Sequence, residues 1–404
     1  MQNEYLYIGQ FDTMSLVRKY GTPLYVYDGV KIQRNYQKIS HFIPYLPKEI
    51  HFPLMCNSNP DILVLVLKLG GHVQANSIPE YQIARIAGFS KESISVTTTN
   101  MSREDMIFYL KEGLQLNLDS IEEVERYGEL VEQRRQQGSP VNSHIGIRIF
   151  VHIQTAGYQV TNLPHPTKPR VGIKEEKFPD VKKLAHKYGL KVIGIHGYLA
   201  FNVLDLDPFL KLNTYLAHCA KQFDDLKYIN VGAGFGVSAK SNEKSFDWQS
   251  YGLNLSALME SMSQYFQRQI HLKLEPGRSL VGDAGYLLAR VINIKNMDNW
   301  TQVGVDCSFG EFARPYIYGS ESAGYHPVIV ASKMDKPNVR EYTVCGNSVL
   351  QRDFLAEDRQ LPKIELDDII AFLNVGAYGA SMMSLFPGRK RPREILILDG
   401  KLQI

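Results

Sequence analysis

Residues 49–70, EIHFPLMCNSNPDILVLVLKLG, contain a short strand-like run and a longer helix-like run. EIHFPLMC is rich in apolar and aromatic side chains, as in a buried strand, and PDILVLVLKLG has the length of a helix. The NSNP between them is a turn signal, and proline suits the first turn of a helix. The stretch therefore predicts one β-strand followed by one α-helix.

The same order recurs along the next two hundred residues or so. Its strand-like runs are HVQAN (72–76), SISVTTT (93–99), LQLNLD (114–119), IGIRIF (145–150), VIGIHGYL (192–199), YINVGAGF (228–235) and HLKLEPG (271–277). Helix-like runs follow the first three, and Ser102 and Ser120 are in place as N-caps of two of these helices. Alternation of this kind predicts a parallel sheet, and eight strands are the number that closes a (β/α)8 TIM barrel.

After residue 282 the pattern changes to strand-like runs without helices between them. These runs are YLLARVINIK (286–295), TQVGVDCS (301–308), HPVIVAS (326–332), REYTVCG (340–346), DDIIAFLN (367–374) and REILILDGKLQI (393–404). They predict a mainly antiparallel β-domain. The opening segment 11–28 has a helix and a strand outside both series. We expect the barrel to span residues 27–282, and the β-domain to combine residues 1–26 with 283–404.

Composition excludes several classes of function. The 404 residues are 44% hydrophobic and 22% charged, as in ordinary globular proteins. The net charge is only +3 and no long basic block is present, which argues against nucleic-acid and membrane-surface partners. The four cysteines lack CxxC spacing and the N-terminus lacks a secretory signal pattern, so we expect a cytoplasmic protein with no metal site. No apolar run reaches the length of about 18–20 residues that spans a bilayer.

Two motifs end barrel strands, where ligands of such barrels gather. YINVGAGFG (228–236) is a strand that enters a glycine turn, and such a turn lets backbone N–H groups approach a phosphate. A Rossmann interpretation is disfavoured because the polar run after Gly236 does not open a helix. The next strand ends in Glu275-Pro-Gly277-Arg278, where the guanidinium suits a phosphate or carboxylate, although a surface salt bridge is the alternative.

Several motifs together resemble a known family. GTPLYVYD, NSNP, VGAGFG, EPGRSLVGDAG, RPYIYG followed by YHP, and VGAYGASM stand in the same order as in fold-type III pyridoxal-phosphate (PLP) decarboxylases. That family includes diaminopimelate and ornithine decarboxylases, and the resemblance covers nearly the whole chain. It implies an alanine racemase-like barrel with a β-domain, PLP as cofactor, a small-molecule substrate, and a head-to-tail homodimer with active sites at the subunit interface.

The resemblance also implies roles for individual residues. Glu275 would face the pyridine nitrogen of PLP, and a carboxylate there favours the protonated, electron-withdrawing ring. The positions that match substrate-binding residues are Arg314, Tyr318 and Asp353. The positions that match the phosphate site are Gly232, Gly234, Gly277, Arg278 and Tyr378. For Tyr378 the alternative is an aromatic residue packed in the β-domain core.

The departures from the family pattern concern the reacting groups. The family lysine that forms the Schiff base with PLP falls on Met55, whose thioether cannot form an imine. Tyr198 stands where a histidine stacks on the cofactor, and Phe201 where a hydroxyl lies near the phosphate. Val349 replaces the catalytic cysteine, and Leu350 replaces the glutamate that follows it in diaminopimelate decarboxylases.

Two hypotheses about function follow from these departures. In the leading one, the chain is a pseudoenzyme or repurposed protein whose pocket keeps PLP, or a PLP-like phosphorylated ligand, without a covalent link, if it binds a cofactor at all. The alternative is an active decarboxylase, a carboxy-lyase of an amino acid or amino-acid-derived compound. Met55 would then be an engineered substitution, or a paralogue in a heterodimer would supply the missing groups.

Overall fold

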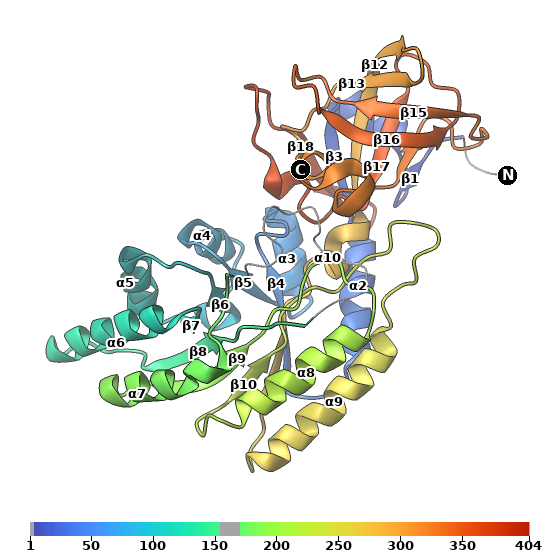
Figure 1. Ribbon diagram of the computed structural model, residues 1–404. Helices are drawn as coiled ribbons and strands as arrows, with labels where there is room; N and C mark the ends of the chain where they lie inside the picture. The colour runs from blue at the N-terminus through green and yellow to red at the C-terminus, as the bar shows by residue number, and fades with distance from the viewer. Residues whose placement is uncertain (1–3, 154–169, 404) are drawn as a thin grey trace. The chain divides into compact units, whose positions relative to one another are not determined.

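The computed structural model describes residues 4–153 and 170–403 and divides into two compact units (Figure 1). The barrel unit contains residues 36–236 and 245–277. The β-unit contains residues 1–35, 237–244 and 278–404. Residues 27–35, 237–244 and 278–282 thus group with the β-unit, although they lie within the range 27–282 expected for the barrel.

The barrel unit is a closed barrel of eight parallel strands, which confirms the eight predicted strands and the TIM-barrel class. Each strand pairs with the next along the chain, and the last pairs with the first. The strands are β4 (Lys48–Pro53), β5 (His72–Ala75), β6 (Ile94–Thr97), β7 (Gln115–Leu118), β8 (His144–Arg148), β9 (Lys191–His196), β10 (Tyr228–Asn230) and β11 (His271–Leu274).

Helices follow most of these strands. They are α3 (Pro60–Lys68), α4 (Ile78–Ile86), α5 (Arg103–Glu112), α6 (Ile121–Gln136), α7 (Phe178–Tyr188), α8 (Asp207–Ala220) and α9 (Trp248–Tyr265), with 3-10 turns at Lys91–Ser93 and Glu175–Lys177, whereas α2 (Gly29–Phe42) precedes the first strand. The predicted caps are confirmed: the Ser102 and Ser120 side chains accept the backbone N–H groups of Asp105 and Glu123. Each such cap contributes about 1 kcal/mol.

The β-unit contains a sheet in which β12 (Gly285–Asn296) is the central strand. The order is β16-β15-β13-β12-β3-β18-β19, and β17 with β14 also joins β12. Its other elements are β1 (Tyr7–Ile8), β2 (Phe11–Asp12), α1 (Thr13–Tyr20), β3 (Leu24–Asp28), α10 (Arg278–Val281), β13 (Thr301–Val305), α11 (Arg314–Tyr318), β14 (Val328–Val330), β15 (Arg340–Cys345), β16 (Phe354–Leu361), β17 (Ile369–Leu373), β18 (Arg393–Leu398) and β19 (Lys401–Gln403), with short turns at Gly282–Ala284, Gly319–Ala323 and Ala380–Met382. Most pairs are antiparallel, as predicted; β13–β15 and β3–β18 are parallel.

Two elements of the β-unit differ from the sequence prediction. β16 has the sequence FLAEDRQL, which is too charged to suggest a strand, and α11 lies between two strand-like runs where no helix was predicted. β16 stands at one end of the sheet order, and charged side chains are common on such edge strands. Its burial alternates only in part, with Asp358 and Gln360 exposed.

The barrel strands bury apolar side chains under the helices and polar side chains inside the barrel. Neighbouring residues of a strand point to opposite faces. In β10, for example, Ile229 is buried on one face while Tyr228 and Asn230 fill the interior. Gly146 and Gly194 leave room for the Tyr228 ring, because a Cβ atom at either position would lie 2.0 Å from Tyr228 atoms. In the described residues, no helix is long and apolar enough to cross a membrane.

Candidate active site

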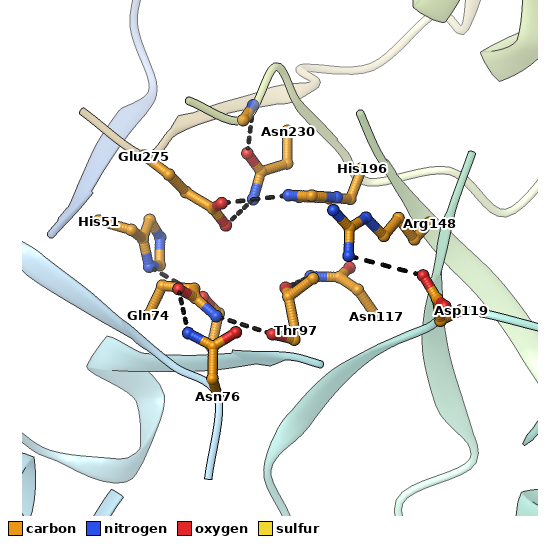
Figure 2. Close-up of polar contacts among 12 residues, drawn as sticks. His51, Gln74, Asn76, Thr97, Asn117, Asp119, Arg148, His196, Asn230 and Glu275 are labelled. Atoms are coloured by element: carbon orange, nitrogen blue, oxygen red, sulfur yellow. Dashed lines mark hydrogen bonds and ion pairs between the residues drawn. The ribbon is translucent and has the colours of Figure 1, made fainter. Parts of the chain in front are cut away.

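Glu275 follows β11 directly and lies inside the barrel (Figure 2). Its side-chain oxygen Oε1 accepts a hydrogen bond from Asn230 Nδ2 at 2.8 Å, and Oε2 pairs with His196 Nε2 at 3.1 Å. Burial acts to raise the pKa of Glu275, but His196 and Asn230 outweigh it and lower that pKa. The carboxylate is therefore ionised at neutral pH, although Glu275 is only 6% exposed.

His196, at the end of β9, is 2% exposed and was not among the predicted site residues. Because Nε2 faces the Glu275 carboxylate, that nitrogen carries a proton. The other ring nitrogen, Nδ1, is buried and has no hydrogen-bond partner among the described residues. A buried polar atom without a partner is uncommon and points to a place that a ligand or a water molecule occupies.

Further polar side chains extend this interior layer (Figure 2). Gln74 Nε2 donates to the Thr97 carbonyl oxygen at 2.9 Å, and Asn117 Nδ2 donates to Thr97 Oγ1 at 2.7 Å. Arg148 Nη1 lies 3.6 Å from Asp119 Oδ1. None of these residues was predicted. Their signal was present, since polar residues alternate with apolar ones in runs such as HVQAN and LQLNLD.

Met55 lies in the turn after β4 and is 48% exposed. Its neighbour Cys56 packs on the EPGR turn, because a Cβ at Gly277 would lie 3.1 Å from Cys56 Sγ. The turn that carries Met55 therefore meets the turn that carries Glu275. In the described part of the barrel unit, no lysine hydrogen-bonds or forms an ion pair with Glu275.

The glycines predicted for phosphate binding have a clear structural role. Gly232 and Gly234 have φ of +69° and +119°, and Cβ atoms there would lie 1.9 Å from the Gly197 carbonyl oxygen and 2.5 Å from that of Ala200. The glycine turn therefore packs on the backbone segment that carries Tyr198. The Tyr198 ring lies 5.8 Å from the Arg148 guanidinium. The roles of these residues toward a cofactor remain predictions.

In the β-unit, four predicted residues lie together. The Arg278 guanidinium lies 5.4 Å from the Tyr378 ring centroid, and the Arg314 guanidinium lies 5.0 Å from Tyr318 and 5.9 Å from Tyr378. Arg314 is 4% exposed and donates to the Ala323 carbonyl oxygen at 2.8 Å. Burial, and then Arg314, lower the pKa of the neighbouring His326 to about 3. A cluster of cations and phenols beside a neutral imidazole suits an anionic group.

Asp353 and Val349 lie in the loop before β16. The Asp353 side chain accepts the backbone N–H of Phe309 at 2.8 Å and that of Ser348 at 3.0 Å, so it holds this loop in shape. Val349 is 90% exposed and Leu350 36% exposed. Neither offers a reactive atom, and the substrate role predicted for Asp353 remains a prediction.

The chain is similar to known proteins of one family. Residues 30–282 match the family model "Pyridoxal-dependent decarboxylase, pyridoxal binding domain". Diaminopimelate decarboxylase of Methanothermobacter thermautotrophicus is 31% identical over 99% of this chain and 92% of its own, and that of Archaeoglobus fulgidus is 28% identical over 96% and 91%. A crystal structure of the Helicobacter pylori diaminopimelate decarboxylase complexed with L-lysine has a TM-score of 0.85, with 27% identity over 97% of this chain and 95% of its own.

These matches confirm the resemblance and the alanine racemase-like fold. They favour the alternative of an active decarboxylase over the pseudoenzyme hypothesis, because these relatives are named as decarboxylases. They give no support to a heterodimer with a paralogue.

Proposed function

The chain belongs to the pyridoxal-dependent decarboxylase family, and on this premise we propose that it is a PLP-dependent carboxy-lyase of an amino acid or an amino-acid-derived compound. The observation that carries this proposal is the buried, ionised Glu275, which is fixed by His196 and Asn230. PLP, when bound, supplies an electron sink for the bond that breaks. The role of Glu275 is to hold a proton on the pyridine nitrogen.

The residues present fit the ring and the phosphate of the cofactor better than they fit a covalent link. Glu275 suits the ring nitrogen, and Arg278 with Tyr378 suits the phosphate. Met55 offers no amine, so we propose that the protein holds PLP by non-covalent contacts. Arg314 and Tyr318 are then the groups for a substrate carboxylate.

The substrate and the assembly are further parts of the proposal. Leu350 has no charge to pair with a distal ammonium group, so a substrate other than diaminopimelate is favoured. We also propose a homodimer in the cytoplasm, in line with the family resemblance.

The test is a PLP titration of the purified protein followed by absorption, with CO2 release measured from carboxyl-labelled amino acids that include diaminopimelate, lysine and ornithine. Borohydride reduction and peptide mapping locate any covalent link. We expect saturable binding, no reduced adduct on residue 55, and CO2 release from one substrate. A protein that does not bind PLP contradicts the proposal.

A second candidate is a cofactor-binding protein without turnover, and the thioether of Met55 is the observation that favours it. The two candidates separate in a Met55→Lys variant. If the natural protein binds PLP but releases CO2 only after this substitution, the second candidate stands. If both proteins release CO2, the carboxy-lyase stands.

A further inference from the structure

A second polar cluster lies inside the barrel at the N-terminal ends of its strands. Glu49 and His51 alternate on β4, so their side chains point to the same face. His51 is in register with His72 on the neighbouring β5, so His72 shares that face. One carboxylate oxygen and one nitrogen from each ring lie within 4.8 Å of one another. Glu49 and His51 from β4 and His72 from β5 thus point to one place.

Both ring nitrogens of His51 make polar contacts inside the barrel. His51 is 1% exposed, and its Nδ1 lies 3.3 Å from the Val73 carbonyl oxygen, which can only accept. Ser95 Oγ also lies 3.3 Å from Nδ1, and Nε2 lies 2.9 Å from Glu49 Oε2. A proton on Nε2 joins the ring to the carboxylate in the metal-free protein, and a metal ion replaces that proton when it binds, because ligands must be deprotonated. Metal-binding histidines commonly donate the other ring N–H to a carbonyl in this way.

His72 adds a second imidazole to the cluster. Its ring centroid lies 5.0 Å from that of His51, and its Nδ1 is buried without a partner among the described residues. A neutral imidazole is the commonest metal ligand in proteins. His72 is half-buried and the Glu49 side chain is 21% exposed, so an ion can reach the cluster from solvent.

One lysine competes for the same carboxylate. Lys273 Nζ lies 3.1 Å from Glu49 Oε2, and His271 Nδ1 lies 3.4 Å from Glu49 Oε1. The Lys273 ammonium group therefore already neutralises the carboxylate that a metal ion would bind. A metal ion can bind the carboxylate and both rings together, at the cost of the Lys273 contact.

We propose that Glu49, His51 and His72 bind one divalent ion of the zinc class. Two imidazole nitrogens and a carboxylate suit zinc, whereas magnesium and calcium prefer oxygen ligands. Three protein ligands leave a position for water or for His271. Glu49 is in register with Lys273, two residues before Glu275, so the cluster is the neighbouring layer of the barrel interior; the metal proposal does not depend on the proposed function. It differs from the expectation of no metal site, which rested on cysteine spacing and did not consider the Glu-x-His pattern.

The test uses the full chain after removal of metals with a chelator. Co2+ is titrated and followed by its visible absorption, and Zn2+ affinity is measured by competition with a chromophoric chelator. We expect one ion per chain in the wild type. His72→Ala should weaken Zn2+ binding by at least about 10- to 100-fold, the loss known for second-shell partners alone. Lys273→Met should tighten binding, because the competing cation is gone.

His144→Ala is the matched control, because His144 also begins a barrel strand but lies outside the cluster. It should bind as the wild type does. Circular dichroism checks the fold of each variant, and His72→Gln replaces His72→Ala if the latter unfolds. The proposal is overturned by a wild type without saturable binding, by a folded His72 variant with unchanged affinity, or by weaker binding in Lys273→Met.

Discussion

Two glutamates inside one barrel, the buried Glu275 and the half-buried Glu49, have different hydrogen-bond and ion-pair partners. Glu275 is bound by an imidazole and an amide, and Glu49 by an ammonium and two imidazoles. Burial opposes ionisation of both, and the partners lower both pKa values. The Glu275 carboxylate keeps a net negative charge that can act on a ligand, whereas Lys273 neutralises that of Glu49. The partners of such an acid therefore decide how much of its charge is left to act on a ligand.

The sharpest test of this contrast is Glu275→Gln. An amide cannot hold a proton on a pyridine nitrogen, so CO2 release should fall by about 100- to 1000-fold, as when one preorganised electrostatic group is removed. The rate and the absorption spectrum of bound PLP are measured together. Glu49→Gln is the control, because it should leave the spectrum unchanged. An unchanged rate in Glu275→Gln would refute the role of Glu275.

Stability should show the reverse order, with a larger loss in Glu49→Gln than in Glu275→Gln. Glu49→Gln leaves Lys273, whose side chain is 13% exposed, without its counter-charge, and we expect the free energy of unfolding to drop by about 3 kcal/mol. Urea denaturation measures it. The double variant Glu49→Gln with Lys273→Met should recover part of the loss. A smaller loss than in Glu275→Gln would break the comparison.

A buried histidine in the β-unit extends the comparison to pH. His326 has a pKa of about 3 when folded, against about 6.5 in an unfolded chain. Between these values only the unfolded chain binds the proton, so its contribution to stability is present above pH 6.5 and is lost as pH falls. The expected slope is at most about 1.4 kcal/mol per pH unit below pH 6.

Denaturation of wild type and of His326→Gln at pH 7, 6 and 5 measures this slope. Glutamine does not titrate, so the two curves should converge as the pH falls. Parallel curves would show that His326 does not couple to folding.

The smallest effect is expected at Val349, which is 90% exposed. Val349→Ser should change the free energy of unfolding by less than about 0.5 kcal/mol, as surface substitutions usually do. Thermal unfolding provides the measurement, with Val344→Ser in the buried part of β15 as the contrasting control. A large loss at Val349 would mean that this loop packs against something in solution.

The sequence predicted the barrel well because strand and helix periodicities are local signals. All eight barrel strands and the Ser102 and Ser120 caps are where the pattern put them. The edge strand β16 escaped because charged residues at an edge resemble a loop. The interior residues His196 and Asn230 escaped for another reason: a polar residue inside a strand carries no local sign of whether it faces a closed barrel interior.

The Tyr228 ring and the two glycines beneath it, Gly146 and Gly194, have a consequence for evolution. The three residues come from three strands and fill one space, so none of them can change alone. A side chain at either glycine would clash with the Tyr228 side chain, and a small residue at position 228 would leave a cavity. In related chains these positions should vary as a set, with a large residue moving from one strand to another. Related chains would then keep the total side-chain volume in this part of the barrel, while the residue at each position varies.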